Sequence, residues 1–399
     1  MGENEQDFEI DDDVVRTSLC ADCARHPSVK KVIAADCIKG RCAFCARDDV
    51  EVRTPENRDA LVMLLRALIR FFYDEHEYNS HWGGDSVLSL FQREDNPILK
   101  PPSSGAYLDD FDEWLQWPAY PDWDKGVAIY AGHDDGVRGM NFAISRTNPS
   151  DFVELQRRLL TENFFQVEPA LEALVEPFLA DIEILLPADE LWYRARLGQK
   201  EVFRRYDLAG FQSNIVRQPW LGTDIGAPPP LKAGIGRLNR AGVSVLYLAS
   251  DANTAVAEIR PHPGHHVSIG GFKSTEALRL ADFNPEIALF SSDDARLSLY
   301  AIIQAFDRLM SLPVIPDERT PYLSTQLLAE VLLRRGFDGV RYRSSVSDGS
   351  NICVFYPAKF DFAQAHSEVR RVESVAYSVS TVPYVIVPGQ DDLPYNRRI

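Results

Sequence analysis

The chain has 399 residues, of which 45% are hydrophobic and 25% charged, a composition typical of a globular protein with two or three domains. Its formal net charge of −17 disfavours general binding to nucleic-acid backbones, although a local basic pocket for a small anion remains compatible with it. No apolar run approaches the roughly 18 residues of a membrane helix. Residues 1–15 are acidic, unlike a signal peptide, so we expect a disordered tail and a cytoplasmic protein.

Five of the six cysteines lie within the first 45 residues. Two C-x-x-C motifs, Cys20–Cys23 and Cys42–Cys45, are separated by 18 residues, a spacing typical of zinc ribbons. A two-residue spacing lets one tight turn present both thiolates to one ion. We therefore predict a structural zinc site within a cysteine module at residues 16–50. The predicted ligands are Cys20, Cys23, Cys42 and Cys45.

The alternatives for these cysteines are free thiols or a redox pair. Cys37 and His26 are spare ligands, so the fourth zinc position is less constrained than the first three. Four thiolates would leave no open coordination position, so the metal would support the fold and take no part in catalysis.

Residues 51–185 are predicted to form a helical domain. Apolar residues recur at helical spacing from Leu61 to Phe72, and further helices are expected at about 150–164 and 167–183. These apolar stripes indicate core packing.

The second half mixes strands and helices without a regular βαβ alternation, so we predict an α+β domain at residues 186–370, followed by a tail at 371–399. Asp251 or Asn253 would cap a short helix that ends near Ile259, and Gly336 would end another helix. The predicted strands are 191–196, 243–249, 266–272, 277–283, 340–343 and 352–356, and the longer helices are 296–310 and 325–335.

Two charged residues lie beside apolar strand or helix residues in this half. Arg194 follows Trp192 and Tyr193, and Glu258 follows a run of small apolar residues. A charge in such a place is unfavourable unless it is paired or used. The two residues either form a structural ion pair or both face a cleft.

Three segments of this half together resemble the RES family, named for its Arg, Glu and Ser. They are Tyr193-Arg194-Ala195-Arg196, then Gly236 to Glu258 with Gly236-Arg237-Leu238-Asn239 and Leu246-Tyr247-Leu248-Ala249, and finally Gly339 to Ser344 followed by Asn351. They occur in the order found in the family.

The resemblance implies an ADP-ribosyltransferase-like fold and an enzyme that consumes NAD. It would cleave the nicotinamide–ribose bond by phosphorolysis or hydrolysis, with phosphate or water as acceptor, or would ADP-ribosylate a protein. Many relatives are bacterial toxins with an antitoxin partner. A non-catalytic module that binds NAD or ADP-ribose is the alternative.

The resemblance also assigns residues. The family triad corresponds to Arg194, Glu258 and Ser344, with Ser345 as the alternative serine, and Arg237 and Tyr247 are further motif positions. Arginine forks suit phosphate oxygens, and a fixed carboxylate suits the positive charge that develops on the ribose.

The first half resembles the HEPN-type region of some RES proteins. Arg70 and His76 are similar to the R-x4–6-H motif of HEPN ribonucleases, which gives an RNase as a further alternative. The acidic neighbours Asp74, Glu75 and Glu77 would repel RNA, so nucleic acid is not an expected partner.

Overall fold

The computed structural model describes residues 19–54, 58–77, 87–104, 106, 127–130, 143–206, 210, 213–311, 322–376 and 379. The acidic tail predicted at 1–15 and most of the tail predicted at 371–399 lie outside these residues. None of the helices in this described part is long and apolar enough to cross a membrane.

The first half of the chain is mainly helical, and its described part has two small antiparallel strand pairs between the helices. It ends in strand β5, which belongs to the large sheet described below. Its elements are η1 (Ala21–Cys23), α2 (Pro27–Ala35), β1 (Cys37–Gly40), β2 (Val50–Arg53), α3 (Arg58–Phe72), β3 (Asp74–Glu77), α4 (Val87–Phe91), β4 (Val127–Tyr130), α6 (Ser150–Leu159), α7 (Phe164–Val175), η4 (Glu176–Phe178) and β5 (Glu183–Leu186).

The helix predicted over 61–72 is confirmed as α3, but the helix predicted over 167–183 ends early. Helix α7 stops at Val175, and the 3₁₀ turn η4 follows because Pro177 has no N–H to continue the helical ladder. The chain is extended from Glu183, where β5 pairs with a strand from the second half.

Arg70 and His76, the pair that resembles the HEPN motif, do not lie on one helix. Arg70 is in the last turn of α3, whereas His76 lies beyond that helix in β3, which pairs with β4. The guanidinium of Arg70 forms an ion pair with Asp294, 2.8 Å away, on a helix of the second half. The HEPN prediction therefore has no support from the arrangement of these two residues.

An eight-stranded mixed sheet organises the second half, and the predicted α+β class is confirmed. The ADP-ribosyltransferase-like topology stays a prediction. The order of the strands across the sheet is β14 (Phe360–Arg371), β10 (His266–Ser274), β6 (Leu191–Leu197), β9 (Leu246–Ala249), β13 (Ser350–Val354), β12 (Gly339–Arg343), β11 (Leu278–Asp282) and β5.

Neighbouring strands of this sheet are antiparallel except β11 and β12. Strand β6 lies between β10 and β9, so its residues are inside the sheet and not at an edge. Strand β14 was not predicted from the sequence, because most of its side chains are exposed and give no apolar pattern.

The described part of the second half also contains the α-helices α8 (Ala252–Glu258), α9 (Asp294–Ser311) and α10 (Tyr322–Arg334) and the 3₁₀ turns η5 (Gly222–Asp224), η6 (Ile287–Phe290) and η7 (Pro357–Lys359). Asp251 caps α8, since its side chain accepts a hydrogen bond from the backbone N–H of Thr254, so of the two predicted caps Asp251 is confirmed. Gly336 follows α10 with φ of +79°, the left-handed conformation typical of a residue that ends a helix.

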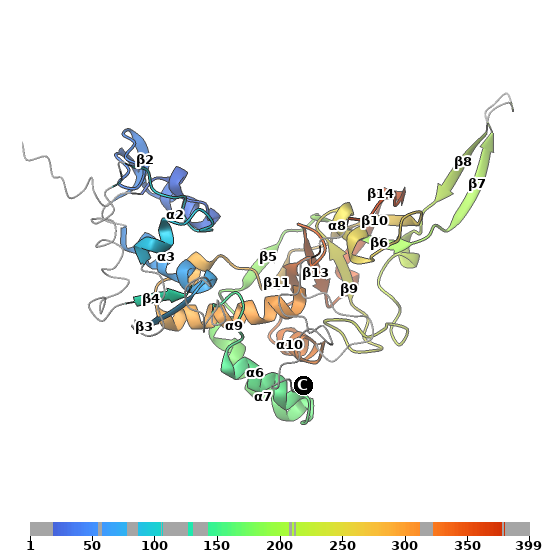
Figure 1. The fold of residues 1–399 in the computed structure, drawn as a ribbon. Coiled ribbons are helices and arrows are strands. Elements are labelled where there is room, and N and C mark those ends of the chain that lie inside the picture. The colour runs from blue at the N-terminus through green and yellow to red at the C-terminus, as the bar shows by residue number, and fades with distance from the viewer. Residues whose placement is uncertain are drawn as a thin grey trace, which may run out of the picture.

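Helix α9 runs from the N-terminal helices toward the large sheet (Figure 1). Buried residues of α3, α6, α7, α9 and α10 belong to one continuous apolar core. At its centre Phe152 of α6 packs edge-on against Phe306 of α9, with ring centroids 4.8 Å apart. Residues on both sides of the predicted domain boundary near residue 185 therefore pack in the same core.

A two-stranded hairpin projects from the rest of the molecule in Figure 1. Its strands are β7 (Glu201–Tyr206) and β8 (Ser213–Gln218), and every residue of β7 is exposed. The sequence did not predict it, because a strand without a buried face has no apolar alternation to detect.

Replacing Phe306 with alanine should lower the free energy of unfolding by about 3–5 kcal/mol, because the ring is fully buried and the cavity would lie between the two halves. Phe165 is the matched control: it is 85% exposed, and Phe165→Ala should change stability by no more than about 0.5 kcal/mol. Denaturant unfolding measures both variants. Equal stability of the two would contradict the shared core.

Candidate active site and cysteine cluster

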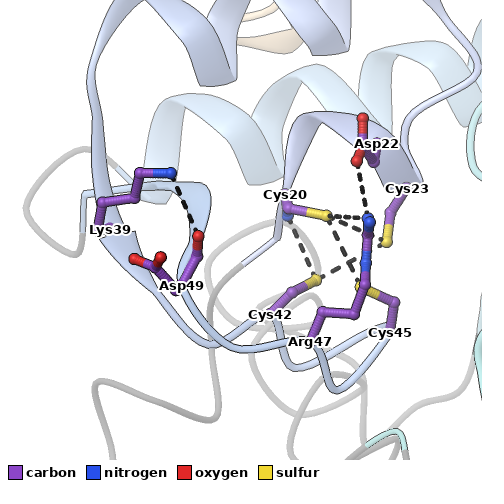
Figure 2. Close-up of polar contacts among 8 residues, drawn as sticks. All are labelled: Cys20, Asp22, Cys23, Lys39, Cys42, Cys45, Arg47 and Asp49. Atoms are coloured by element: carbon purple, nitrogen blue, oxygen red, sulfur yellow. Dashed lines mark hydrogen bonds and ion pairs between the residues drawn. The ribbon is translucent and has the colours of Figure 1, made fainter.

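Four cysteine sulfurs form a compact cluster near the N-terminus (Figure 2). Cys20 and Cys23 lie at the 3₁₀ turn η1, and Cys42 and Cys45 lie in the turn between β1 and β2. The Sγ–Sγ distances are 3.5 Å for Cys20–Cys23, 3.8 Å for Cys20–Cys45 and 3.7 Å for Cys23–Cys42. These distances are much longer than a disulfide bond, and none of the four cysteines forms a disulfide.

The separations match the edges of a metal-sized tetrahedron. Four sulfurs that each lie about 2.3 Å from a zinc ion are about 3.8 Å apart along each edge. All four sulfurs of the cluster lie within 4.8 Å of one another, and three of the four cysteines are buried. The donor set and its spacing therefore fit zinc.

Donors around the cluster suit anionic sulfur. Arg47 Nε lies 3.3 Å from Cys45 Sγ, Arg47 Nη2 lies 2.9 Å from Asp22 Oδ2, and the backbone N–H of Cys20 points to Cys42 Sγ at 3.4 Å (Figure 2). These contacts stabilise thiolates, the form that binds a metal.

The two spare ligands lie apart from the four sulfurs. His26 caps helix α2, since its Nδ1 accepts a hydrogen bond from the backbone N–H of Ser28. The thiol of Cys37 contacts the carbonyl of Ala34. Neither residue is part of the cluster.

A cavity of about 440 Å³ lies at the large sheet and helix α8. It is lined by β6, β9, β12, β13, α8 and α10, and by the loop before β9. Arg194, Arg237, Tyr247 and Glu258, which the sequence places far apart, all line it. Ser344 is hydrogen-bonded to one of these residues, Glu258.

Glu258, the last residue of α8, has one oxygen fixed by two donors. Its Oε1 accepts hydrogen bonds from Ser344 Oγ at 2.7 Å and from Asn351 Nδ2 at 2.6 Å. Within the described residues its other oxygen accepts no hydrogen bond. The side chain is solvent-exposed at the cavity, so this oxygen is accessible to a ligand. Ser344, and not Ser345, makes this contact.

Helix α8 is fixed against the loop that carries the serine. Asp251 accepts from Thr254 Oγ1 at 2.6 Å, and this hydroxyl lies 2.9 Å from Ser347 Oγ in that loop. An added Cβ at Gly349 would lie 2.2 Å from Thr254 Oγ1, so only glycine permits this close approach. The contact sets the position of Glu258 relative to Ser344.

Arg194 projects from β6 into the cavity and is partly buried. Its Nη1 donates to the backbone carbonyl oxygen of Tyr247 at 2.9 Å. No carboxylate among the described residues pairs with it, and burial lowers its pKa. Arg194 and Glu258 thus form no ion pair with each other, which excludes the structural alternative considered for them. A guanidinium with donors to spare in a cavity can bind an anion.

The Gly236–Asn239 loop forms one wall through Tyr247. The Tyr247 hydroxyl donates to Asn239 Oδ1 at 2.9 Å and accepts from the backbone N–H of Leu238 at 3.0 Å, so the ring and not the hydroxyl is free to face a ligand. Burial raises its pKa well above the usual value. An added Cβ at Gly236 would lie 2.3 Å from Asn239 Oδ1, so this position requires glycine.

Helix α10 supports the same loop. Gln326 Nε2 donates to the carbonyl oxygens of Gly236 and Asn239, at 2.8 and 3.1 Å. The Arg237 guanidinium donates to the carbonyl oxygen of Leu309 and lies over the Tyr322 ring, 5.5 Å from its centroid.

A family model for the RES domain matches residues 212–379. The match covers less than half of the chain and begins after β6, so Glu258, Arg237, Tyr247 and Ser344 lie within it and Arg194 lies outside it. No curated protein matches the sequence.

Among solved structures, the crystal structure of the M. tuberculosis MbcT–MbcA toxin–antitoxin complex is similar at 12% identity. The comparison has a TM-score of 0.26 and covers 51% of this chain and 93% of that chain.

Four further side chains line the cavity, although the sequence assigned no role to them: Asn351, Tyr342, Tyr193 and Tyr322. Three of them, Tyr193, Tyr342 and Asn351, belong to the segments that resemble the RES family. Tyr322 gives no signal in the sequence. Cys353 on β13 is buried, and desolvation raises its pKa to about 12.

We expect the stability of the N-terminal region to fall as the pH drops from about 7 to about 5, through the cap at His26. Burial lowers the pKa of His26, so the folded state binds this proton less readily than the unfolded state does, and stability is lost as the pH falls. A protonated ring also cannot accept from the Ser28 N–H. His26→Asn keeps a capping acceptor and should reduce the pH dependence of the melting temperature; an unchanged dependence would contradict this assignment.

Proposed function

We propose that this chain binds NAD in the cavity and cleaves the bond between nicotinamide and ribose. One observation carries the proposal: the Arg194 guanidinium and the Glu258 carboxylate line the same cavity, and among the described residues the first has no carboxylate partner and the second is fixed on one oxygen only. The RES match, which includes Glu258 and Ser344, and the resemblance of the motifs to this NAD-consuming family support the substrate.

The residues suit the charge changes of this reaction. As the glycosidic bond breaks, its electron pair moves to the nicotinamide nitrogen and the ribose gains positive charge. The accessible oxygen of Glu258 would stabilise that charge, while Ser344 and Asn351 hold the carboxylate in place. Arg194 would bind a phosphate oxygen of NAD or of a phosphate acceptor, and the Tyr247 ring would face the nicotinamide or ribose.

The acceptor completes the reaction at the ribose carbon. Phosphate would give phosphorolysis and water would give hydrolysis; a protein side chain would give ADP-ribosylation. Continuous turnover would deplete NAD in a cell, so the proposal includes a toxin role in which a protein antitoxin restrains the enzyme.

Replacing Glu258 with glutamine should lower kcat for NAD loss by about 10²–10³, with little change in KM, because the amide keeps the shape and loses the charge that stabilises the transition state. Purified wild-type and variant proteins are incubated with NAD, with and without phosphate, and mass spectrometry identifies the products. Their identity decides the acceptor. Wild-type protein that leaves NAD intact under both conditions would refute the proposal.

Arg194→Met provides the test of anion binding, and Arg196→Met is its matched control on the same strand. Arg196 lies over the Trp220 ring, 4.3 Å from its centroid, and does not line the cavity. The Arg194 variant should raise KM for NAD by at least about tenfold, whereas the control should stay within about twofold of wild type. Equal KM values for the two variants would remove Arg194 from the site.

We also propose that the cysteine cluster holds one structural zinc ion through Cys20, Cys23, Cys42 and Cys45. The tetrahedral separations and the donors from Arg47 and the Cys20 N–H support this assignment. Four thiolates fill the coordination shell, so the ion would link η1 to the turn between β1 and β2 without acting on substrate.

Elemental analysis of gently purified protein should find one zinc per chain. Cys42→Ser should lose the metal and lower the melting temperature, because a buried ligand is removed. Cys37→Ser is the control, since this thiol lies outside the cluster, and it should keep one zinc per chain. Wild-type protein without zinc would overturn the assignment.

A further inference from the structure

The last turn of α9, residues 307–311, contacts two separate segments of the cavity wall. The carbonyl oxygen of Leu309 accepts from the Arg237 guanidinium. Asp307 and Ser311 contact Arg343, the residue directly before Ser344. One helical turn therefore contacts both the loop of residues 236–239, which carries Arg237, and the strand end that leads into the loop of residues 344–349, here called the serine loop.

The contact between Asp307 and Arg343 is an ion pair with a fully buried carboxylate. Asp307 has an exposed fraction of 0%, and its Oδ2 accepts from Arg343 Nε at 2.9 Å and also from Nη2. Burial raises the pKa of Asp307, and the hydrogen bonds from Arg343 act in the opposite direction. The other oxygen, Oδ1, accepts from Ser311 Oγ at 3.4 Å, so Arg343 supplies the positive charge that this buried carboxylate requires.

The backbone of Arg343 is held by the same turn. Ser311 Oγ lies 3.3 Å from the carbonyl oxygen of Arg343, and this carbonyl belongs to the peptide group that contains the Ser344 nitrogen. That nitrogen in turn donates to the carbonyl oxygen of Gly349 at 3.0 Å. A shift of Arg343 would move Ser344 and its hydroxyl away from Glu258.

We propose that Asp307 is a positioning residue: by holding Arg343 it fixes Ser344, and through Ser344 the carboxylate of Glu258. This inference rests on the proposed function and extends it to a residue that does not line the cavity. A buried ion pair is weak evidence for stability, since apolar residues of similar size often serve as well. We therefore attribute the pair's location beside Ser344 to the way it fixes the position of Arg343, and not to a contribution to the free energy of folding.

The same strand offers a matched control. Arg341, two residues before Arg343, pairs with the buried carboxylate of Asp282 at 2.6 Å. This pair is of the same chemical kind and lies on the same strand, but it does not hold the peptide group of Ser344. If both pairs only stabilised the fold, removal of either pair would therefore have the same effect on stability and on activity.

The experiment compares the double variants D307L/R343M and D282L/R341M in the full chain. Both remove a buried charge together with its partner, so both should fold with melting temperatures near that of wild type. D307L/R343M should lower kcat for NAD loss by about 10- to 100-fold with KM within about twofold, because a small displacement of a catalytic group affects the reaction more than binding. D282L/R341M should keep kcat within about twofold.

Amide hydrogen exchange of residues 344–349 gives a readout that does not need activity. It should be faster than wild type in D307L/R343M and unchanged in D282L/R341M. An unchanged kcat in D307L/R343M, or equal losses in both double variants, would overturn the positioning role.

Wild-type protein that leaves NAD intact would refute the proposed function alone, and the exchange rates would then decide the inference. Should a double variant fail to fold, Asp307→Asn and Asp282→Asn replace the pair under the same criteria.

Discussion

The two hydrogen bonds to one oxygen of Glu258 are the constraint on which the candidate site depends. The donors come from different places: Ser344 begins the turn after β12, and Asn351 lies on the neighbouring strand β13. Glu258 itself ends a seven-residue helix, α8, that Asp251 caps. Two side chains, from the turn after β12 and from β13, thus fix the carboxylate that α8 carries, so it keeps its direction although it is exposed. Charge-assisted hydrogen bonds of this kind are about twice as strong as neutral ones, so they can fix an exposed group.

Helix α9 connects the two halves of the molecule through side-chain contacts at both of its ends. Near its start Asp294 pairs with Arg66 and Arg70 of α3, and near its end Arg308 donates to the carbonyl oxygens of Ile144 and Thr147. Its apolar side packs into the core that the N-terminal helices share with α10. The N-terminal region is consequently part of the support of the cavity. The helix that contacts Arg343, the residue before Ser344, is therefore itself held by residues outside the RES match.

Much of the fold was predictable wherever a buried face repeats. Strands β6, β10 and β11 and helices α3, α9 and α10 lie close to their predicted positions because their apolar periodicity reflects the core. The hairpin β7–β8 and the edge strand β14 were missed, since exposed strands carry no such pattern. In the site, Arg194 and Glu258 could be selected because charges beside apolar residues are unusual. Asp307 could not, because an aspartate on an amphipathic helix normally indicates the solvent face, and only the structure shows that it is buried and bound to Arg343.

The position of β6 inside the sheet determines where the second half of the chain can be cut. A fragment cut at the limits of the family match would begin at residue 212 and lack this strand, which separates β10 from β9. Without β6, the facing edges of β10 and β9 would expose unpaired backbone groups to solvent, and such open edges promote aggregation. The fragment would also have no guanidinium at position 194. A fragment that keeps the sheet intact must therefore begin before Leu191, and the helix packing around Phe306 argues for keeping the whole chain.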